Sequence, residues 1–171
     1  MDENRPPDET TPSDVCRAFL LKLGRTPDKS QRHRIVAACI KVPKPWVEEF
    51  LWEALADPNE SVRDVVMREL CARPSLHLEW IVRRLSLPPW YARSSALSVI
   101  GRRRIREALP GIGGAVCDSN VEVRRAAAEA LGEIGGEQAV HLLVRLKKDP
   151  NPYVRAAAEE AIEKTSGVRF T

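Results

Sequence analysis

A unit of about 31 residues recurs along this chain of 171 residues. The segment DSNVEVRRAAAEALGEIG begins at Asp118, and the related segment DPNPYVRAAAEEAIEKTSG begins at Asp149. Arginines recur in the same register at intervals of 30 or 31 residues, at Arg63, Arg93, Arg124 and Arg155. A period of this length holds two short helices and two tight turns, so the chain is predicted to be a stack of helical hairpins.

The second half of each unit has the pattern of an amphipathic helix. Counted from Val123, apolar residues fall at offsets of 3, 4, 7, 8 and 11, which is the spacing of one helix face. Asp118 and Asn120 are suited to cap the start of this helix, and Gly132 or Gly135 permits a left-handed exit. Each hairpin leaves apolar surface on both flanks, so it is predicted to be stable only when stacked.

The predicted fold is therefore all-α, an α-solenoid (alpha-alpha superhelix) of about five stacked hairpins and about ten helices. Residues 1–12 contain no apolar residue after Met1 and are predicted to be a disordered tail. A single repeat domain is predicted over residues 13–171. Its hairpins are expected at approximately 13–42, 44–73, 75–103, 105–135 and 136–166, with Ser13–Gly24 and Ser30–Val42 as a degenerate first pair.

The repeated residues resemble HEAT repeats, specifically the short variety first associated with phycobilisome lyases, within the armadillo-like folds. The family pattern is matched over one unit by Asp118, Asn120, Val123, Arg124, Ala126, Ala127, Ala130, Leu131, Gly132, Ile134 and Gly135. Other units depart from it, since Cys71 replaces a glycine and Leu87 replaces the turn aspartate before Arg93. The resemblance extends over residues 57–162 and is clearest over residues 118–162.

This resemblance implies a protein that works through a surface. In the family, the second helices of the hairpins line a concave face that binds other proteins. Two enzyme groups use similar repeats. The deoxyhypusine hydroxylases hold iron with paired His-Glu motifs, and no such doublet occurs at His33, His77 or His141. The bilin lyases have no portable motif, so lyase-like or lyase-accessory activity stays open as a further alternative.

The residues give little support for catalysis, a metal or a cofactor. The cysteines are isolated, without a C-x-x-C or Cys/His cluster, and are expected to be buried reduced thiols: Cys16, Cys39, Cys71 and Cys117. The run Gly111-Ile112-Gly113-Gly114 lacks a preceding strand and a following Lys-Ser/Thr. We interpret it as a loosened or broken first helix, and we predict no catalytic residues, no metal site and no cofactor.

The recurrent arginines allow two interpretations, as a ladder of anion-binding side chains or as ties between hairpins. The structural interpretation is favoured, because three of them follow an aspartate by six residues. The predicted structural ladder consists of Asp57, Arg63, Asp118, Arg124, Asp149 and Arg155. Arg93 has Leu87 in the aspartate position. It is therefore expected to be the ladder member that is free to bind a partner.

Positive charge is concentrated in the middle of the chain. The whole chain has a formal charge of only +3, but residues 75–106 hold seven arginines against one glutamate, a net charge of +6. Residues 118–166 hold nine acidic and seven basic residues, a net charge of −2. Arginine together with Trp80, Trp90 and Tyr91 is typical of protein-binding hot spots and also of nucleic-acid grooves. Nucleic-acid binding through the basic segment 83–106 is therefore the main alternative.

By analogy with the family, the recognition positions are those of the second helices that lie off the core stripe. They run from basic and aromatic in the middle of the chain to acidic near the C-terminus, whereas a phosphate backbone requires a continuous basic track. We therefore predict a non-catalytic protein–protein interaction or scaffold module with an unidentified protein or peptide partner. The predicted partner-binding residues on the concave face are Arg68, Tyr91, Arg93, Arg102 and Arg125.

The remaining expectations concern location and assembly. The N-terminus lacks the apolar core of a signal peptide, and no stretch approaches the roughly 20 apolar residues of a spanning helix. A cytoplasmic location without membrane binding is expected. A monomer is the default expectation, and the sequence does not identify whether the open ends of the solenoid pair into a dimer.

Overall fold

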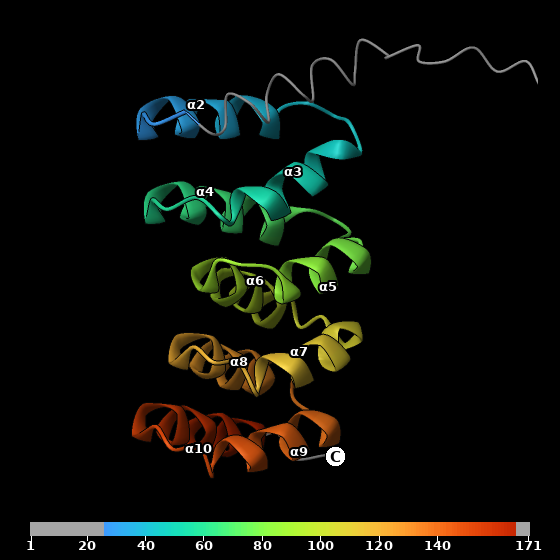
Figure 1. Ribbon diagram of the computed structural model, residues 1–171. Helices are drawn as coiled ribbons and strands as arrows, with labels where there is room; N and C mark the ends of the chain where they lie inside the picture. The colour runs from blue at the N-terminus through green and yellow to red at the C-terminus, as the bar shows by residue number, and fades with distance from the viewer. Residues whose placement is uncertain (1–25, 167–171) are drawn as a thin grey trace, which may run out of the picture.

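The structure, a computed structural model, describes residues 26–166, and within them it consists of helices and short connections (Figure 1). The predicted tail 1–12 and the predicted helix Ser13–Gly24 lie outside the described residues. The helices are α2 (Lys29–Ile40), α3 (Trp46–Ala54), α4 (Glu60–Ala72), α5 (Leu78–Ser86), α6 (Trp90–Arg103), the 3-10 helix η1 (Arg106–Ala108), α7 (Leu109–Ala115), α8 (Val121–Ile134), α9 (Glu137–Leu146) and α10 (Pro152–Ser166).

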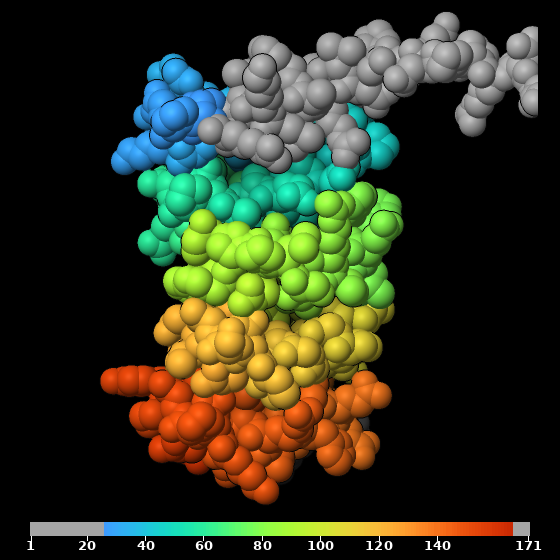
Figure 2. Space-filling model, viewed as in Figure 1, coloured from blue at the N-terminus to red at the C-terminus, as the bar shows by residue number. Residues whose placement is uncertain are grey.

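The helices form antiparallel pairs that stack in chain order. The pairs α3/α4, α5/α6, η1–α7/α8 and α9/α10 lie inside the ranges expected for the last four hairpins. Figure 1 shows two rows, with the first helices α3, α5, α7 and α9 on one side and the second helices α4, α6, α8 and α10 on the other. Helix α2 packs on α4 and takes the first place in the second row. The prediction of an α-solenoid is confirmed, and Figure 2 shows the hairpins as successive layers.

Local signals in the sequence set the helix boundaries. The side chains of Asn59 and Asn120 accept hydrogen bonds from backbone N–H groups two residues later, at the starts of α4 and α8. Helix α8 ends at Gly135, whose φ of 66° is in the left-handed region that glycine adopts without strain. The residue one repeat before Gly135 is Arg104, which ends α6 and also has a positive φ, of 50°. Of the two glycines expected to allow the exit from α8, Gly135 is therefore the one that does so.

The core runs through the stack between the two rows. The stripe predicted from Val123 is buried in α8, including Ala126, Ala127, Ala130, Leu131 and Ile134. Second helices approach each other very closely in the C-terminal half. A Cβ added at Gly101 of α6 would lie 2.8 Å from Cα of Ala130, and one added at Gly132 of α8 would lie 2.8 Å from Cβ of Ala161. Glycine at these two positions is what permits the spacing of α6, α8 and α10.

In the hairpin formed by η1, α7 and α8, the first helix is the most irregular of the described first helices. A 3-10 turn leads into α7, which is only seven residues long and contains Gly111, Gly113 and Gly114. The sequence led us to expect a loosened or broken helix here. The structure instead has a short helix, in which the three glycines are helical. A Cβ added at Gly113 or Gly114 would have no neighbour within 4 Å. The outer side of α7 is therefore poor in side chains.

Candidate functional site

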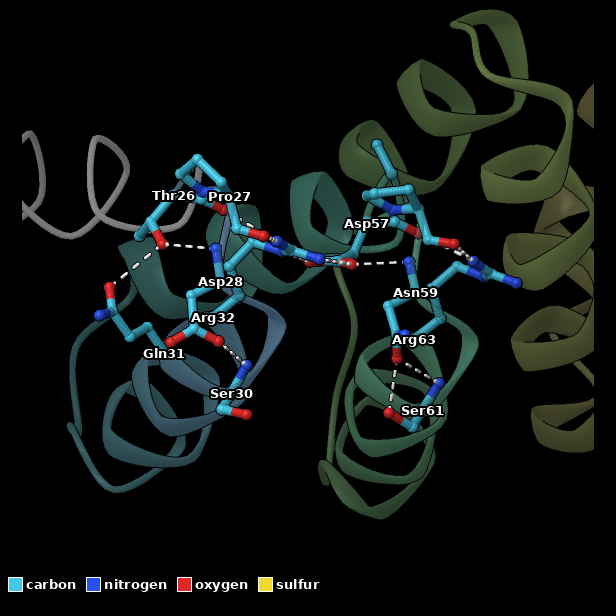
Figure 3. A network of polar contacts seen from close by, with 12 residues as sticks. Thr26, Pro27, Asp28, Ser30, Gln31, Arg32, Asp57, Asn59, Ser61 and Arg63 are labelled. Atoms are coloured by element: carbon cyan, nitrogen blue, oxygen red, sulfur yellow. Dashed lines mark hydrogen bonds and ion pairs between the residues drawn. The ribbon is translucent and has the colours of Figure 1, made fainter.

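The turn aspartates and the recurrent arginines form a ladder along the turns that join first to second helices. Figure 3 shows the first pair, in which Arg32 of α2 reaches Asp57 of the next turn. Each paired arginine binds a carboxylate that lies 25 residues later, in the next turn. The Nε–Oδ2 distances are 2.6 Å for Arg32–Asp57, 2.7 Å for Arg93–Asp118 and 2.6 Å for Arg124–Asp149. A second hydrogen bond from NH2 makes each pair bidentate. The carboxylate thus ties each turn to the hairpin before it.

The same arginines also hold their own turns. NH1 of Arg124 donates to the carbonyl oxygens of Asp118 and Ser119, six and five residues earlier. Arg63 and Arg155 make the equivalent bonds to Asp57 and Asp149. Within each turn the Asp57, Asp118 or Asp149 carboxylate also accepts the backbone N–H two residues later. The six predicted ladder residues are therefore occupied in structural contacts.

The pairing changes at the turn before α6. The position 25 residues after Arg63 is Pro88, so no aspartate is available there. The guanidinium of Arg63 instead lies over the Tyr91 ring, 4.8 Å from its centroid, and the Tyr91 hydroxyl is 3.4 Å from the Ala56 carbonyl oxygen. A cation–π contact therefore joins α4 to α6 where an ion pair joins the other second helices.

The expectation that Arg93 is free for a partner is wrong. Arg93 is a full member of the ladder, because its guanidinium binds both carboxylate oxygens of Asp118. Neither Leu87, six residues before Arg93, nor Pro88, 25 residues after Arg63, is an aspartate, and the residue left without a ladder carboxylate is Arg63 and not Arg93. Sequence reasoning also missed Arg32, a buried ladder member, although it lies 31 residues before Arg63 and the period could have identified it.

The ion pair between Arg124 and Asp149 shifts the pKa values of both groups. Hydrogen bonds from Arg124 lower the pKa of Asp149 despite the burial of the carboxylate. The carboxylate in turn raises the pKa of Arg124. Both groups thus stay charged in the folded protein.

The off-core positions of the second helices form a charged surface, which we call the second-helix face. Arg68 of α4 and Arg102 of α6 are exposed on it. The positions equivalent to Arg68 hold Glu129 in α8 and Glu160 in α10, and those equivalent to Arg102 hold Glu133 in α8 and Lys164 in α10. Glu133 binds Lys164 of α10, so equivalent positions of neighbouring helices meet across this face. The concave shape expected for it stays a prediction.

The five predicted partner-binding residues are not equally available. Arg68 and Arg102 are exposed, whereas Tyr91 is half-buried against Arg63 and Arg93 is held by Asp118. Arg125 is held between Glu122 and Glu129 of its own helix, with the Glu122 pair at 2.9 Å. The second-helix face therefore offers Arg68 and Arg102 as its accessible cations among the five.

Several arginines of the basic segment serve the fold. Arg103 donates to the carbonyl oxygens of Cys71, Arg73 and Pro74, and so closes the end of α4. Arg84 is buried and donates to the carbonyl oxygen of Pro88. Burial lowers the pKa of the Arg84 guanidinium. The exposed Arg83 lies within 4 Å of the carboxylates of Glu49 and Glu53.

Other candidate chemistry is not assembled in the described part of the chain. Over residues 26–166, no three His, Cys, Asp or Glu side chains come together in a way that could hold a metal ion. Cys39 is buried as expected, but Cys71 is only partly buried and Cys117 is exposed, within 3.3 Å of Arg145. Cys16 lies outside the described residues. None of the described helices is long and apolar enough to cross a membrane.

Comparisons with known proteins agree with this architecture. A model of HEAT repeats matches residues 78–163. Human deoxyhypusine hydroxylase in complex with glycerol is 20% identical and superposes with a TM-score of 0.59, over 90% of this chain and 63% of that chain. The complex of CpcE and CpcF of phycocyanin lyase from Nostoc sp. PCC7120 is also 20% identical, with a TM-score of 0.57, over 98% of this chain and 68% of that chain.

These similarities concern the fold. At 20% identity, the two solved structures show a shared helical-repeat architecture. The chain spans less than two thirds of the length of the hydroxylase chain it resembles. No curated protein matches the sequence.

Proposed function

Because this chain belongs to the HEAT-repeat family, we propose that it is a non-catalytic protein-interaction or scaffold module that binds a protein or peptide on its second-helix face. The observation that carries the proposal is the charge distribution on that face. Arg68 and Arg102 are exposed at one end, and Glu129 and Glu160 are exposed at the other. A partner with the complementary order of charges gains steering and register from such a surface. A cytoplasmic location is part of the same proposal.

The distribution of arginines favours a protein over a nucleic acid as the partner. Affinity for nucleic acid depends on the number of phosphates that exposed cations neutralise. Arg84 is buried, Arg93 is paired with Asp118, and Arg103 is turned onto backbone carbonyls. The acidic residues of α8 and α10 would then repel a phosphate backbone that continued along the face.

The proposal is tested by reversing the charge of the two exposed arginines. Affinity purification from the native host should recover a partner with the wild-type chain and lose it with the double variant Arg68→Glu/Arg102→Glu. The matched control is Lys147→Glu, an exposed cation at the end of α9 in the other row. Melting temperatures should be the same for all three chains. Retention of the partner by the double variant contradicts the proposed surface.

Nucleic-acid binding through residues 83–106 is the alternative with a direct test. A mobility-shift titration with single- and double-stranded oligonucleotides at two salt concentrations is expected to show no salt-sensitive complex at moderate ionic strength. A complex that weakens steeply with salt and is lost in Arg102→Glu would favour nucleic acid instead.

Lyase-type or lyase-accessory activity is a further alternative, and it rests on the fold shared with the CpcE–CpcF complex. Incubation of the chain with a bilin and an apoprotein, alone and with a second lyase-type subunit, is expected to give no covalent adduct. Formation of an adduct would replace the proposal of a non-catalytic module.

A further inference from the structure

A buried carboxylate joins helix α3 to the start of helix α5. Glu48 of α3 is only 4% exposed. Its Oε1 accepts the backbone N–H of His77 at 2.6 Å and the indole N–H of Trp52 at 3.3 Å, and its Oε2 lies 2.6 Å from Nδ1 of His77. His77 is the residue that caps the start of α5. Because α3 and α5 belong to neighbouring hairpins, these contacts form a polar connection between two layers, which we call the Glu48–His77 link.

The link has no counterpart at the later junctions of the first-helix row. Glu48 lies 15 residues before Arg63, and His77 lies 16 residues before Arg93. At the next two junctions the same two positions hold apolar residues, Leu78 with Ala108 and Leu109 with Ala139. A titratable pair at these positions therefore belongs to the α3–α5 junction alone among the described layers.

The geometry assigns a hydrogen to Nδ1 of His77. A carboxylate oxygen only accepts hydrogen bonds, so Nδ1, at 2.6 Å from Oε2 of Glu48, donates in both the neutral and the charged ring. The proton that the ring gains and loses is therefore the one on Nε2. The side chain of His77 is 70% exposed, so it exchanges this proton with solvent.

The charge of the ring changes the environment of the buried carboxylate. With a protonated imidazole, Glu48 is part of an ion pair, whereas with a neutral imidazole it keeps its hydrogen bonds but has no opposite charge beside it. The hydrogen bond to Glu48 raises the pKa of His77 above its ordinary value of 6.5. The stabilisation is therefore fully present below that value, and it is lost as the pH rises through the higher folded pKa.

The other charged groups near His77 are carboxylates and guanidiniums. Glu79 lies on α5 itself, and Arg83 of α5 lies within 4 Å of the carboxylates of Glu49 and Glu53 on α3. Helices α6, η1 and α7 also pack on α5. Their charged residues are Arg93, Arg102, Arg103, Arg106 and Glu107. Imidazoles and thiols are the side chains that ordinarily titrate near neutral pH, and these elements hold none besides His77.

The link lies at the junction where the second-helix row lacks its ladder pair. On that side, Arg63 of α4 lies over the Tyr91 ring of α6 and is not paired with a carboxylate among residues 26–166. In the first-helix row of the same junction, the buried carboxylate of Glu48 connects the layers. The contact between α2–α4 and the following layers thus depends on a pair that changes its charge near neutral pH.

We propose that the Glu48–His77 link is a pH-sensitive contact that controls how firmly α2–α4 are held on the rest of the stack. A protonated His77 holds α5 on α3, and loss of the proton loosens this junction. Arg68 of α4 and Arg102 of α6 lie on opposite sides of it. Loosening therefore alters their relative position on the second-helix face; this consequence rests on the proposed function, whereas the junction itself is tested without a partner.

Nuclear magnetic resonance of the full chain tests the link directly. The imidazole of His77 should titrate with a midpoint above 6.5, and the indole N–H signal of Trp52 should shift with the same midpoint, because both rings bind Glu48. In His77→Gln the Trp52 signal should no longer shift over this range. A His77 midpoint at or below 6.5, or a Trp52 shift that persists in His77→Gln, overturns the proposal.

Hydrogen exchange tests the loosening of the junction. Protection factors, corrected for the intrinsic effect of pH on exchange, are compared for α2–α4 and α6–α10 at about pH 5.5 and about pH 8, on either side of the ordinary histidine pKa. In the wild-type chain, α2–α4 should lose protection relative to α6–α10 by at least about twofold as the pH rises. His77→Gln should show the looser junction at both pH values, because its side chain is neutral at both.

His141→Gln is the matched control. His141 lies on α9, its side chain is 78% exposed, and its contact with Glu137 of the same helix is 3.8 Å long. This variant should keep the pH dependence of the wild-type chain. Equal pH dependence in the wild-type chain and His77→Gln, or its loss in His141→Gln, overturns the proposal. Because these measurements use no partner, failure of the link and failure of the second-helix face are distinguishable.

Discussion

The turn aspartates and the ladder arginines each make contacts within their own turn and between neighbouring hairpins. The carboxylate of Asp149 receives Nε and NH2 of Arg124 from the hairpin before, while NH1 of Arg155 holds the backbone of the same turn. Removing either partner leaves a largely buried polar group without its hydrogen bonds, which costs more than the net value of the bond itself.

We therefore expect Asp149→Asn and Arg124→Gln each to lower the free energy of unfolding by about 1–3 kcal/mol, measured by urea denaturation. Arg155→Gln is the matched control, because Arg155 binds its own turn but no carboxylate in the described residues. Its effect should be clearly smaller. An effect of Arg155→Gln equal to that of Arg124→Gln would show that the ion pair adds nothing to the carbonyl contacts.

The same pair gives the stability of the protein a defined dependence on acid pH. The folded pKa of Asp149 is lowered from its ordinary value of 3.8, so this contribution is fully present above that value. It is lost as the pH falls through the lower folded pKa. Asp149→Asn should remove this part of the dependence when unfolding is measured between pH 2 and pH 5, values that bracket the ordinary pKa of an aspartate.

Residue spacing alone predicted the structural role of the ladder but assigned the wrong partner to its carboxylates. An aspartate lies six residues before three of the four arginines, so each of these arginines was associated with the aspartate of its own turn, and Arg93 then seemed to lack its aspartate. The carboxylate actually reaches back across the stack by 25 residues, so the substitution at Pro88 affects Arg63. The repeat period shows which residues are equivalent in different hairpins. It does not show which neighbouring layer the side chain of a ladder residue reaches, because that depends on how the layers pack.

Glycines in this chain have two different structural roles in helices. Gly101 and Gly132 lie where second helices approach each other, while Gly113 in α7 faces open space. The sequence placed glycine near the end of α8 but could not distinguish the close approach at Gly132 from the left-handed exit at Gly135. Only the packing of α10 on α8 separates the two roles.

Alanine substitutions should therefore have opposite effects at these positions. Gly132→Ala is expected to lower the free energy of unfolding by about 1–3 kcal/mol. The new methyl carbon would lie 2.8 Å from Cβ and 3.1 Å from Cα of Ala161, which is too close for an unstrained contact. Gly113→Ala is expected to raise it by up to about 1 kcal/mol through helix propensity. Thermal or urea unfolding of the two variants measures both. Destabilisation by Gly113→Ala would indicate a neighbour that closes on α7.

At the scale of the whole stack, we expect the junction between α4 and α6 to be weaker than the later junctions between second helices. Among residues 26–166 no carboxylate pairs with Arg63, and Cys71 and Val99 stand at the register positions that hold glycine and alanine in the next layers. The α4–α6 contact is less extensive than those of α6 with α8 and of α8 with α10. The HEAT-repeat match begins at residue 78, on the C-terminal side of this junction. Stability in a solenoid depends on such nearest-neighbour interfaces.

Hydrogen exchange at increasing urea should therefore show α2–α4 opening before α6–α10. Tyr91→Ala should increase the difference in opening free energy between α2–α4 and α6–α10, because it removes the ring that covers Arg63. Tyr153→Ala is the matched control, since Tyr153 is the register equivalent of Tyr91 and is 73% exposed. Simultaneous opening of all the helices in the Tyr91→Ala variant would contradict a weak junction.

The fixed offset of the ladder also determines how such a chain can change its length by duplication and loss. If residues 105–135 were deleted, Asp149 would follow Arg93 by 25 residues, and Gly101 would stand opposite Ala161. Both contacts between layers would thus be restored by a deletion of one whole period. A deletion one residue longer or shorter would change the 25-residue offset, and where the extra or missing residue falls inside a helix, it would also rotate the residues after it in that helix by about 100°. The hairpin is therefore the unit that such a chain could gain or lose while both contacts between layers are kept.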